Sequence, residues 1–142
     1  MNVKTILDEK GRDVVTVGPD FVLRDVVSIL NRRRIGAVVV VDDANAICGI
    51  LSERDVVRAL ATTGARALDG RVAETMTEKV VLCTEDHTVH QIMEMMTVSR
   101  FRHLPVEKDG RLAGIVSIGD VVRKRIEAIE REAEEMKAYI AG

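Results

Sequence analysis

Gly49-Ile-Leu-Ser-Glu-Arg-Asp-Val-Val-Arg58 recurs in the sequence as Gly114-Ile-Val-Ser-Ile-Gly-Asp-Val-Val-Arg123, an offset of 65 residues. Upstream of these stretches the likeness continues with an offset of 66 residues, so that Arg34 corresponds to Arg100. The one-residue gap falls where a turn is expected, next to Asp109-Gly110, a dipeptide typical of tight hairpins. The chain therefore contains an internal repeat of two copies.

Both copies contain the same order of secondary-structure signals. A short β-rich segment and a turn are followed by a helix with apolar residues at i, i+3, i+4 and i+7, then by two apolar strands and a second helix. The continuous apolar runs predict strands that are buried on both faces. The sequence thus predicts an α/β (α+β) fold built from two β-α-β-β-α units. The segments are Val14–Val17, Leu23–Leu30, Ala37–Val41, Ile47–Leu51 and a helix from about Asp55, then Val80–Cys83, Val89–Met96, His103–Val106, Leu112–Val116 and a helix from about Asp120.

The repeat suggests a division into three parts: a first domain over residues 1–66, a second over 67–125, and a C-terminal amphipathic helix over 126–142. Apolar residues along this helix and just before it are spaced alternately four and three positions apart, which is a heptad pattern. Two interpretations stay open, a helix packed on its own domain and a helix that pairs with a second copy. The heptad residues are Val122, Ile126, Ile129, Ala133, Met136 and Ile140.

The composition excludes several classes of function. With 2% aromatic residues and a net charge of −2, the chain is a poor candidate for base stacking or for a broad phosphate-backbone contact, so no nucleic-acid partner is expected. The longest apolar run, Ile35–Val41, is far shorter than the roughly 20 residues of a membrane span. The two cysteines form no CxxC pair, and free thiols fit a reducing compartment, so we expect a cytoplasmic protein without a membrane partner.

The Ser-x-x-Asp element of the repeated stretch lies where a strand is expected to pass into a helix. The free N–H groups of a helix N-terminus attract anions, and a carboxylate in the first turn can accept hydrogen bonds from both hydroxyls of a ribose. The same pattern is also close to a capping box, which needs no ligand. Arginines precede the second strand of each copy, at Arg32–Arg34 and Arg100–Arg102, and they suit either phosphate binding or a solvated helix end.

The ordered duplicate resembles a tandem pair of CBS domains, the module named after cystathionine β-synthase, of the small stand-alone prokaryotic type. The resemblance extends from Val3 to about Arg125. It implies two domains packed with pseudo-two-fold symmetry as a Bateman module, followed here by the C-terminal helix. It also implies clefts for an adenosine ligand and a homodimer of modules. The matching stretches are Val15–Pro19, Arg34–Ala37, Gly49–Asp55, Arg102–Val106 and Gly114–Asp120.

The resemblance assigns a role to each candidate ligand-binding residue, and it assigns no catalytic residue and no metal ligand. Carboxylates for the ribose hydroxyls are Asp55 and Asp120, and hydroxyls for ribose or phosphate are Ser52 and Ser117. The adenine slot comprises Ile35, Gly36 and Ala37 with Leu104 and Pro105. Further backbone and apolar contacts come from Thr16, Val17, Met76, Thr77 and Val81. The residues expected to face the phosphates are Arg34, Arg100, Arg102 and His103. The remaining candidates are the motif residues Arg54 and Gly119.

The expected function is a regulatory sensor of energy or redox state, which binds AMP, ADP, ATP or NAD(H) and acts through a homodimer or an unidentified partner protein. The alternative is a ligand-free structural protein that assembles through its sheets and its C-terminal helix. An enzyme is not expected, because no nucleophile has a matching base and no metal set is complete. The clefts differ chemically, since Glu53 is unfavourable near a phosphate whereas Arg102 and His103 make the second copy more cationic.

Overall fold

The first unit of the fold is a small sheet with two helices on it. In the computed structural model, which describes residues 1–142, its elements are β1 (Thr16–Val17), α2 (Leu23–Arg33), β2 (Ala37–Val41), β3 (Ile47–Ser52) and α3 (Glu53–Thr63). The strand order is β1-β2-β3, with β1 parallel and β3 antiparallel to β2. This is the predicted β-α-β-β-α order.

The sheet of this unit is covered on both faces. Val38 and Val40 point toward the helices and join a cluster with Leu23, Val26 and Leu51. Val39 alternates with them along β2 and is also fully buried, although it is not part of that cluster. Side chains alternate between the faces of a strand, so both faces are shielded, as the continuous valine run predicts.

The second unit contains α4 (Val89–Ser99), β4 (His103–Lys108), β5 (Arg111–Ser117) and α5 (Ile118–Ala141), with β4 antiparallel to β5. The strand predicted over Val80–Cys83 is reduced to one parallel bridge between Cys83 and Val106. The amide of Val80 is taken by a local bond to the Glu78 carbonyl at 3.0 Å, so this part of the segment makes no ladder. The predicted hairpin turn is confirmed, because Asp109 and Gly110 both adopt positive φ between β4 and β5.

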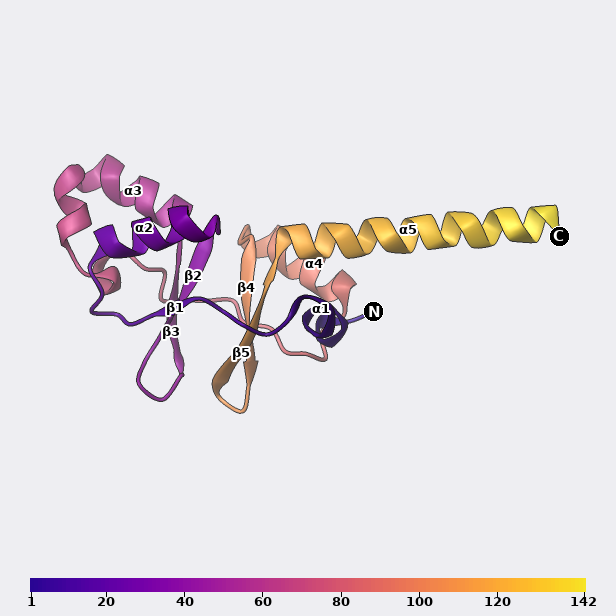
Figure 1. Cartoon of the computed structure of the whole chain (residues 1–142), viewed down its shortest axis with the longest axis horizontal. Coiled ribbons are helices and arrows are strands. Elements are labelled where there is room, and N and C mark those ends of the chain that lie inside the picture. The colour runs from indigo at the N-terminus through magenta and orange to yellow at the C-terminus, as the bar shows by residue number, and fades with distance from the viewer.

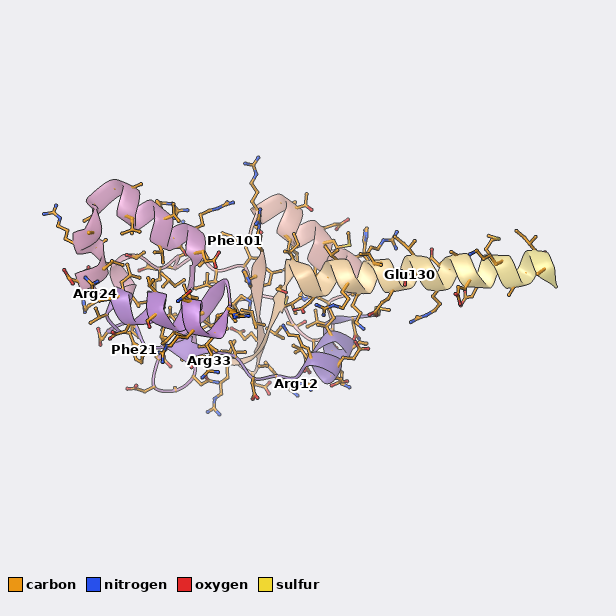
Figure 2. All side chains as sticks on the ribbon, turned by 45° about the horizontal axis from the view of Figure 1, so that its top comes forward. Arg12, Phe21, Arg24, Arg33, Phe101 and Glu130 are labelled. Atoms are coloured by element: carbon orange, nitrogen blue, oxygen red, sulfur yellow. The ribbon has the colours of Figure 1, made fainter.

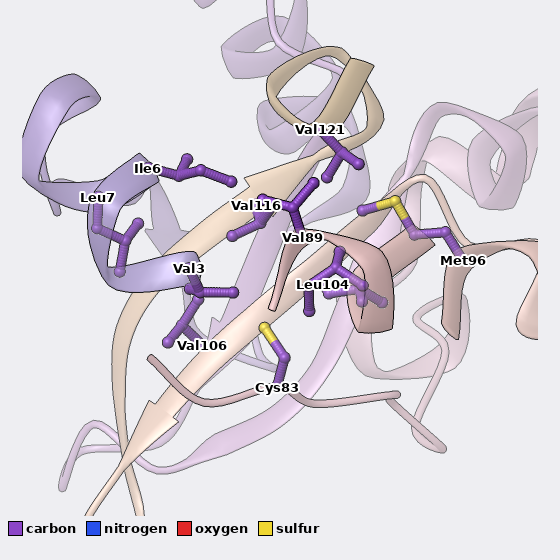
Figure 3. Packing of buried hydrophobic residues seen from close by; sticks show 11 residues of the cluster. Val3, Ile6, Leu7, Cys83, Val89, Met96, Leu104, Val106, Val116 and Val121 are labelled. Atoms are coloured by element: carbon purple, nitrogen blue, oxygen red, sulfur yellow. The ribbon is translucent and has the colours of Figure 1, made fainter. Parts of the chain in front are cut away.

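The segments that precede the two repeats are exchanged between the units. Helix α1 (Val3–Lys10) inserts Val3, Ile6 and Leu7 into the core of the second unit, beside Leu104 (Figure 3). The linker between the repeats contains the short 3₁₀ turns η1 (Ala65–Asp69) and η2 (Val72–Glu74), and Val72 is buried in the core of the first unit. Each repeat thus completes its core with the chain that precedes the other repeat.

The glycine of each repeated motif makes this exchange possible. A Cβ atom on Gly49 would lie 2.8 Å from the carbonyl oxygen of Thr77, and one on Gly114 would lie 2.9 Å from Leu7 Cδ1. The exchanged segments therefore cross β3 and β5 so closely that a side chain at either glycine would collide with them.

Helix α5 is longer than a second helix of the repeat requires. It runs without a break through the predicted boundary at residue 126 and projects from the second unit well beyond the rest of the chain (Figure 1). Only its first turns touch the protein body, where Val121 and Lys124 are buried. From Ile129 to Gly142 every residue is exposed. No helix in the structure is apolar over enough length to cross a membrane.

Candidate functional site

A cavity of about 420 Å³ lies where the two units meet. One wall comes from the junction of β3 and α3, together with Gly36 and Thr77, and the other comes from the segment between α4 and β4. A Cβ atom on Gly36 would lie only 3.1 Å from His103 Cε1, which shows how closely the two walls approach. The lining residues are Gly36, Ile50, Ser52, Glu53, Arg54, Asp55, Arg58, Thr77, Ser99, Arg100, Phe101, Arg102 and His103.

Asp55 is the acidic centre of this cavity and is 4% exposed. Its Oδ2 atom accepts hydrogen bonds from the amide of Ser52 at 2.8 Å and from the Ser52 hydroxyl at 3.1 Å, which with the bond back from the Asp55 amide forms the capping box. Its Oδ1 atom accepts from the Thr77 hydroxyl at 3.0 Å and from Arg58 at 3.2 Å. Capping therefore occupies one carboxylate oxygen, while the other faces side chains that line the cavity.

Three arginines without acidic partners line the cavity, Arg54 on the same wall as Asp55, and Arg100 and Arg102 on the opposite wall. Arg54, Arg100 and Arg102 are exposed, and none of them has a carboxylate within salt-bridge distance. Arg100 adopts the left-handed conformation at the C-cap of α4, as Arg34 does in the matching position of α2. Unpaired guanidinium groups offer planar donor pairs that suit phosphate oxygens. The cavity therefore combines a buried carboxylate with free arginines on both walls.

His103 lies on the second wall, where that wall approaches Gly36 of the first. Burial lowers the pKa of its imidazole, and the nearby positive charge of Lys10 acts in the same direction. The carboxylates of Asp120 and Glu53 oppose this shift without reversing it. The ring is thus held toward its neutral form, and a ligand phosphate would favour the charged one.

The second Ser-x-x-Asp motif lies in a different environment. Asp120 Oδ2 accepts from the Ser117 amide at 2.9 Å, which completes another capping box, and from Lys10 Nζ at 2.6 Å. Burial opposes ionisation of Asp120, but the hydrogen bonds from Lys10 and Ser117 outweigh it and lower the pKa of the carboxyl. Ser117, Gly119 and Asp120 do not line the Asp55 cavity. The two motifs are alike in sequence and unlike in what faces them.

Two further cavities adjoin these elements. One of about 440 Å³ lies between α4 and the first turns of α5 and shares Arg54, Arg100 and Arg102 with the Asp55 cavity. The other, of about 350 Å³, lies beside α2 and is lined by Arg34 and Ile35 among others. The cationic side of the Asp55 cavity therefore continues into a neighbouring hollow.

The structure gathers eight of the predicted ligand-binding residues around the Asp55 cavity, which are Gly36, Ser52, Arg54, Asp55, Thr77, Arg100, Arg102 and His103. None of the aliphatic side chains predicted for the adenine slot lines this cavity. Ala37, Leu104 and Pro105 are buried in their strands, and Ile35 lies in the cavity beside α2. Of the remaining candidates, Val17 is buried, Met76 and Val81 pack against the cores, and Thr16 is exposed on β1.

Three lining residues were not expected from the sequence: Ile50, Arg58 and Ser99. Arg58 lies one helical turn after Asp55 and belongs to the repeated stretch, so i, i+3 spacing from the carboxylate was a usable signal. Ile50 and Ser99 come from the body of β3 and the end of α4, and no motif marks them. No group of three or more His, Cys, Asp or Glu side chains gathers as a metal site.

The family model described as CBS domain matches residues 3–62 and 72–127, the two units with their exchanged segments. The chain belongs to the CBS-domain family. The CBS domain-containing protein CBSX3, mitochondrial, from Arabidopsis thaliana is 37% identical over 127 residues. That match covers 87% of this chain and 62% of the length of CBSX3.

Solved structures of CBS-domain proteins share the fold. The CBS-domain containing protein ATU1752 from Agrobacterium tumefaciens is 53% identical with a TM-score of 0.85, and the match covers 88% of this chain and 99% of that one. The CBS domain pair of protein MJ0100, solved in complex with 5′-methylthioadenosine and S-adenosyl-L-methionine, is 26% identical with a TM-score of 0.80. That match covers 90% of this chain and 98% of the MJ0100 chain. CBS-domain pairs of this kind are regulatory modules, and the MJ0100 pair binds adenosyl ligands.

Proposed function

We propose that this CBS-domain pair is a regulatory sensor that binds a phosphorylated adenosine ligand, AMP, ADP, ATP or NAD(H), in the Asp55 cavity. The adenosyl ligands of the MJ0100 pair support an adenosine ligand in general. The signal of ligand binding passes to a second copy or to a regulated partner protein. Both cysteines are free, which supports a reducing compartment such as the cytoplasm.

One observation carries the proposal: a buried carboxylate and three unpaired arginines line the same cavity of about 420 Å³. Asp55 Oδ1 accepts ribose hydroxyls in exchange for the Thr77 hydroxyl or the Arg58 guanidinium that it binds without a ligand. Arg54, Arg100 and Arg102 offer donors for phosphate oxygens. Phe101 is the one phenyl ring in the lining, and it offers an apolar contact for the adenine in place of the aliphatic slot. The excess of positive charge favours an anionic ligand over a neutral or cationic one.

Calorimetric titration with AMP, ATP and NADH tests the proposal. We expect at least one of them to bind with a dissociation constant below millimolar. Asp55→Asn should weaken that binding at least tenfold, because a hydrogen bond to a charged group contributes about 1.5–3 kcal/mol and each 1.4 kcal/mol is about tenfold in affinity.

Asp120→Asn is the matched control for this experiment, since it removes the same charge from the same position of the other capping box. We expect it to leave the affinity unchanged. The proposal is overturned if none of the three compounds binds at millimolar concentration, or if the two variants weaken binding equally.

A second candidate function is a ligand-free interaction protein, and the completeness of both capping boxes favours it. Ser52 and Asp55, like Ser117 and Asp120, bond each other in both directions and so stabilise the start of a helix without any ligand. In this case none of the nucleotides binds, while the state of association is the same in their presence and absence. Light scattering with and without each nucleotide at millimolar concentration distinguishes the two functions.

A further inference from the structure

Helix α5 carries an apolar stripe, and from Ile129 onward no other part of its own chain covers it. We call this stripe the α5 seam: Val122, Ile126, Ile129, Ala133, Met136 and Ile140. Its large members are between 48% and 76% exposed. A helix stretch without tertiary contacts is marginal in water at this length, because most helical stability in proteins comes from packing of the apolar face. We therefore expect the α5 seam to pack against a partner.

The direction of the seam is set by the contacts at the root of the helix. Val121 points into the core of the second unit, and Lys124 is buried where it forms ion pairs with Glu9 of α1 and with Glu127. In the heptad that places Ile126 at a and Ile129 at d, Val121 and Lys124 occupy c and f. Positions c and f lie on the side of a helix opposite to a and d, so the seam from Ile126 onward faces away from its own domain, while Val122 borders the hollow against α4.

We propose that the α5 seam binds the α5 seam of a second copy as a parallel two-stranded coiled coil. The charges that flank the seam indicate both that its partner is a second copy and that the two helices run parallel. In a parallel pair, position g of one helix faces position e of the next heptad in the other helix. Arg125 then faces Glu130 of the second copy, and Glu132 faces Lys137 of the second copy. Both contacts join opposite charges, and two-fold symmetry repeats each of them.

An antiparallel pair that overlaps the whole seam, with Val122 opposite Ile140, Ile126 opposite Met136 and Ile129 opposite Ala133, has the opposite electrostatics. It brings Glu130 against Glu130 and Glu132 against Glu132 of the second copy, and it sets Arg123 against Lys137. Like charges at these positions disfavour pairing. Glu130 lies on the part of α5 that stands clear of the protein body (Figure 2), so no group of the same chain intervenes.

Parallel pairing has a consequence for the modules. The helices leave the second unit directly after the Ser117–Asp120 motif. Two parallel helices therefore place the second units of both copies side by side at the root of the coiled coil. This assignment is independent of which ligand the Asp55 cavity takes.

Disulfide trapping on the full chain tests the direction of pairing. Ala133 is at position a, so in a parallel dimer Ala133→Cys places its thiol against the same thiol of the second copy. Ala138→Cys, at position f on the outer side, is the matched control. We expect mild oxidation to cross-link most of the Ala133→Cys chains and few of the Ala138→Cys chains, with the unmodified chain showing the background of Cys48 and Cys83.

Charge reversal in the Ala133→Cys background supplies an independent arm. In a parallel dimer, Lys137→Glu sets two carboxylates against each other at both contacts between positions 132 and 137, and Glu132→Lys sets two ammonium groups against each other there. Each variant alone should therefore cross-link about tenfold more slowly. An equal mixture of the two variants restores attraction at both contacts and should cross-link at the original rate. Glu135→Lys, at position c, changes the charge equally and should have no effect.

Three results overturn the proposal. The first is equal cross-linking of the Ala133→Cys and Ala138→Cys chains, or none of either. The second is faster association of the Lys137→Glu chain, because in the antiparallel pair this change turns the contact with Arg123 into an attraction. The third is a mixture of the two charge variants that stays as slow as each alone. Circular dichroism confirms in each case that the variant is folded.

Discussion

Lys10 Nζ lies 2.6 Å from Asp120 Oδ2, whereas Asp55, the matching carboxylate of the first repeat, receives the hydroxyl of Thr77. Both contacts come from an exchanged segment: Lys10 ends α1, and Thr77 follows η2. Each carboxylate also pairs with an exposed arginine one turn later, Asp55 with Arg58 at 3.2 Å and Asp120 with Arg123 at 3.7 Å. The two sites therefore differ in what the exchanged segment supplies, a neutral hydroxyl at Asp55 and a charged ammonium group at Asp120. The two clefts of the pair are therefore unequal in charge although the motif is the same.

The first prediction concerns the number of ligand molecules that bind. With Asp120 neutralised by Lys10, we expect one nucleotide per chain in the unmodified protein. Lys10→Met keeps most of the side-chain volume, removes the charge and frees the carboxylate, so a second and weaker binding event should appear in calorimetry.

Lys4→Met is the control for the Lys10 variant, because Lys4 lies on the same helix and pairs only with the exposed Asp8. It should leave the stoichiometry at one. Two molecules bound per unmodified chain, or a Lys10→Met titration identical to the original one, would show that Lys10 does not close the second cleft.

The second prediction concerns the cationic wall. Arg102→Gln should weaken ATP binding about tenfold, the size of one lost hydrogen bond to a charged group, and should leave adenosine binding unchanged because adenosine has no phosphate. Arg111→Gln is the control, because it removes the same charge at the start of β5, away from the cavity. Equal losses for ATP and adenosine would mean that Arg102 acts on the shape of the cavity and not on the phosphates.

The third prediction is a pH dependence of stability that originates at His103. Its pKa in the folded chain lies below the ordinary 6.5, chiefly because the ring is buried, with Lys10 and Arg102 adding to the effect against Asp120 and Glu53. The unfolded chain then binds more protons just below pH 6.5, so the free energy of unfolding decreases as the pH falls from 6.5 toward the pKa of the folded state.

Urea unfolding at pH values about one unit above and one unit below the unfolded pKa of about 6.5 measures this loss of stability. In His103→Gln the loss should be smaller, since the titrating group is gone. His90→Gln is the control, because the side chain of His90 is 80% exposed. Identical losses in the original chain and in His103→Gln would contradict the assignment.

The fourth prediction concerns the close approach of the exchanged segments. Gly49→Ala places a methyl group against the Thr77 backbone, which cannot rotate away, and should lower the free energy of unfolding by about 1–3 kcal/mol. At Gly119 the nearest atom to an added Cβ is 3.6 Å away, and the residue lies in the first turn of α5. Gly119→Ala should therefore be neutral or stabilise by up to about 1 kcal/mol. Equal effects of the two changes would show that the crossing at Gly49 adapts.

Local patterns in the sequence were sufficient for most of the fold. The apolar spacing at Leu23, Val26 and Leu30 predicted the face of α2 that is buried, and Asp109-Gly110 predicted the hairpin between β4 and β5. The short strand over Val80–Cys83 was overestimated, because residue propensity does not reveal that the Val80 amide is used in a local turn. The packing of α1 on the second unit could not be predicted from the sequence either, because nothing in Val3–Leu7 itself indicates which of the two apolar cores it joins.

The candidate site was likewise predictable where local sequence patterns mark its residues, and unpredictable where it depends on packing between the units. Ser52, Asp55, Thr77 and Arg102 were found because each belongs to a repeated stretch or a charged cluster, or lies in the linker that the family resemblance marks. That Leu104 and Ala37 are buried in their sheets, and that Lys10 reaches Asp120, depends on how the units pack. Long-range contacts of this kind become visible only once the fold is known.

The exchange of α1 and the linker also constrains how the protein folds as it is synthesised. Lys10 and Asp120 are 110 positions apart, so α1 leaves the ribosome long before its partner strands exist. The core of the first unit lies wholly between Val15 and Met76, so all of its members have been synthesised once the linker is complete. The core of the second unit needs Val3, Ile6 and Leu7 from the start of the chain together with Val116 and Val121 from near its end. The apolar face of α1 therefore stays without its native partner until translation is nearly complete, while the first unit already has every residue of its core.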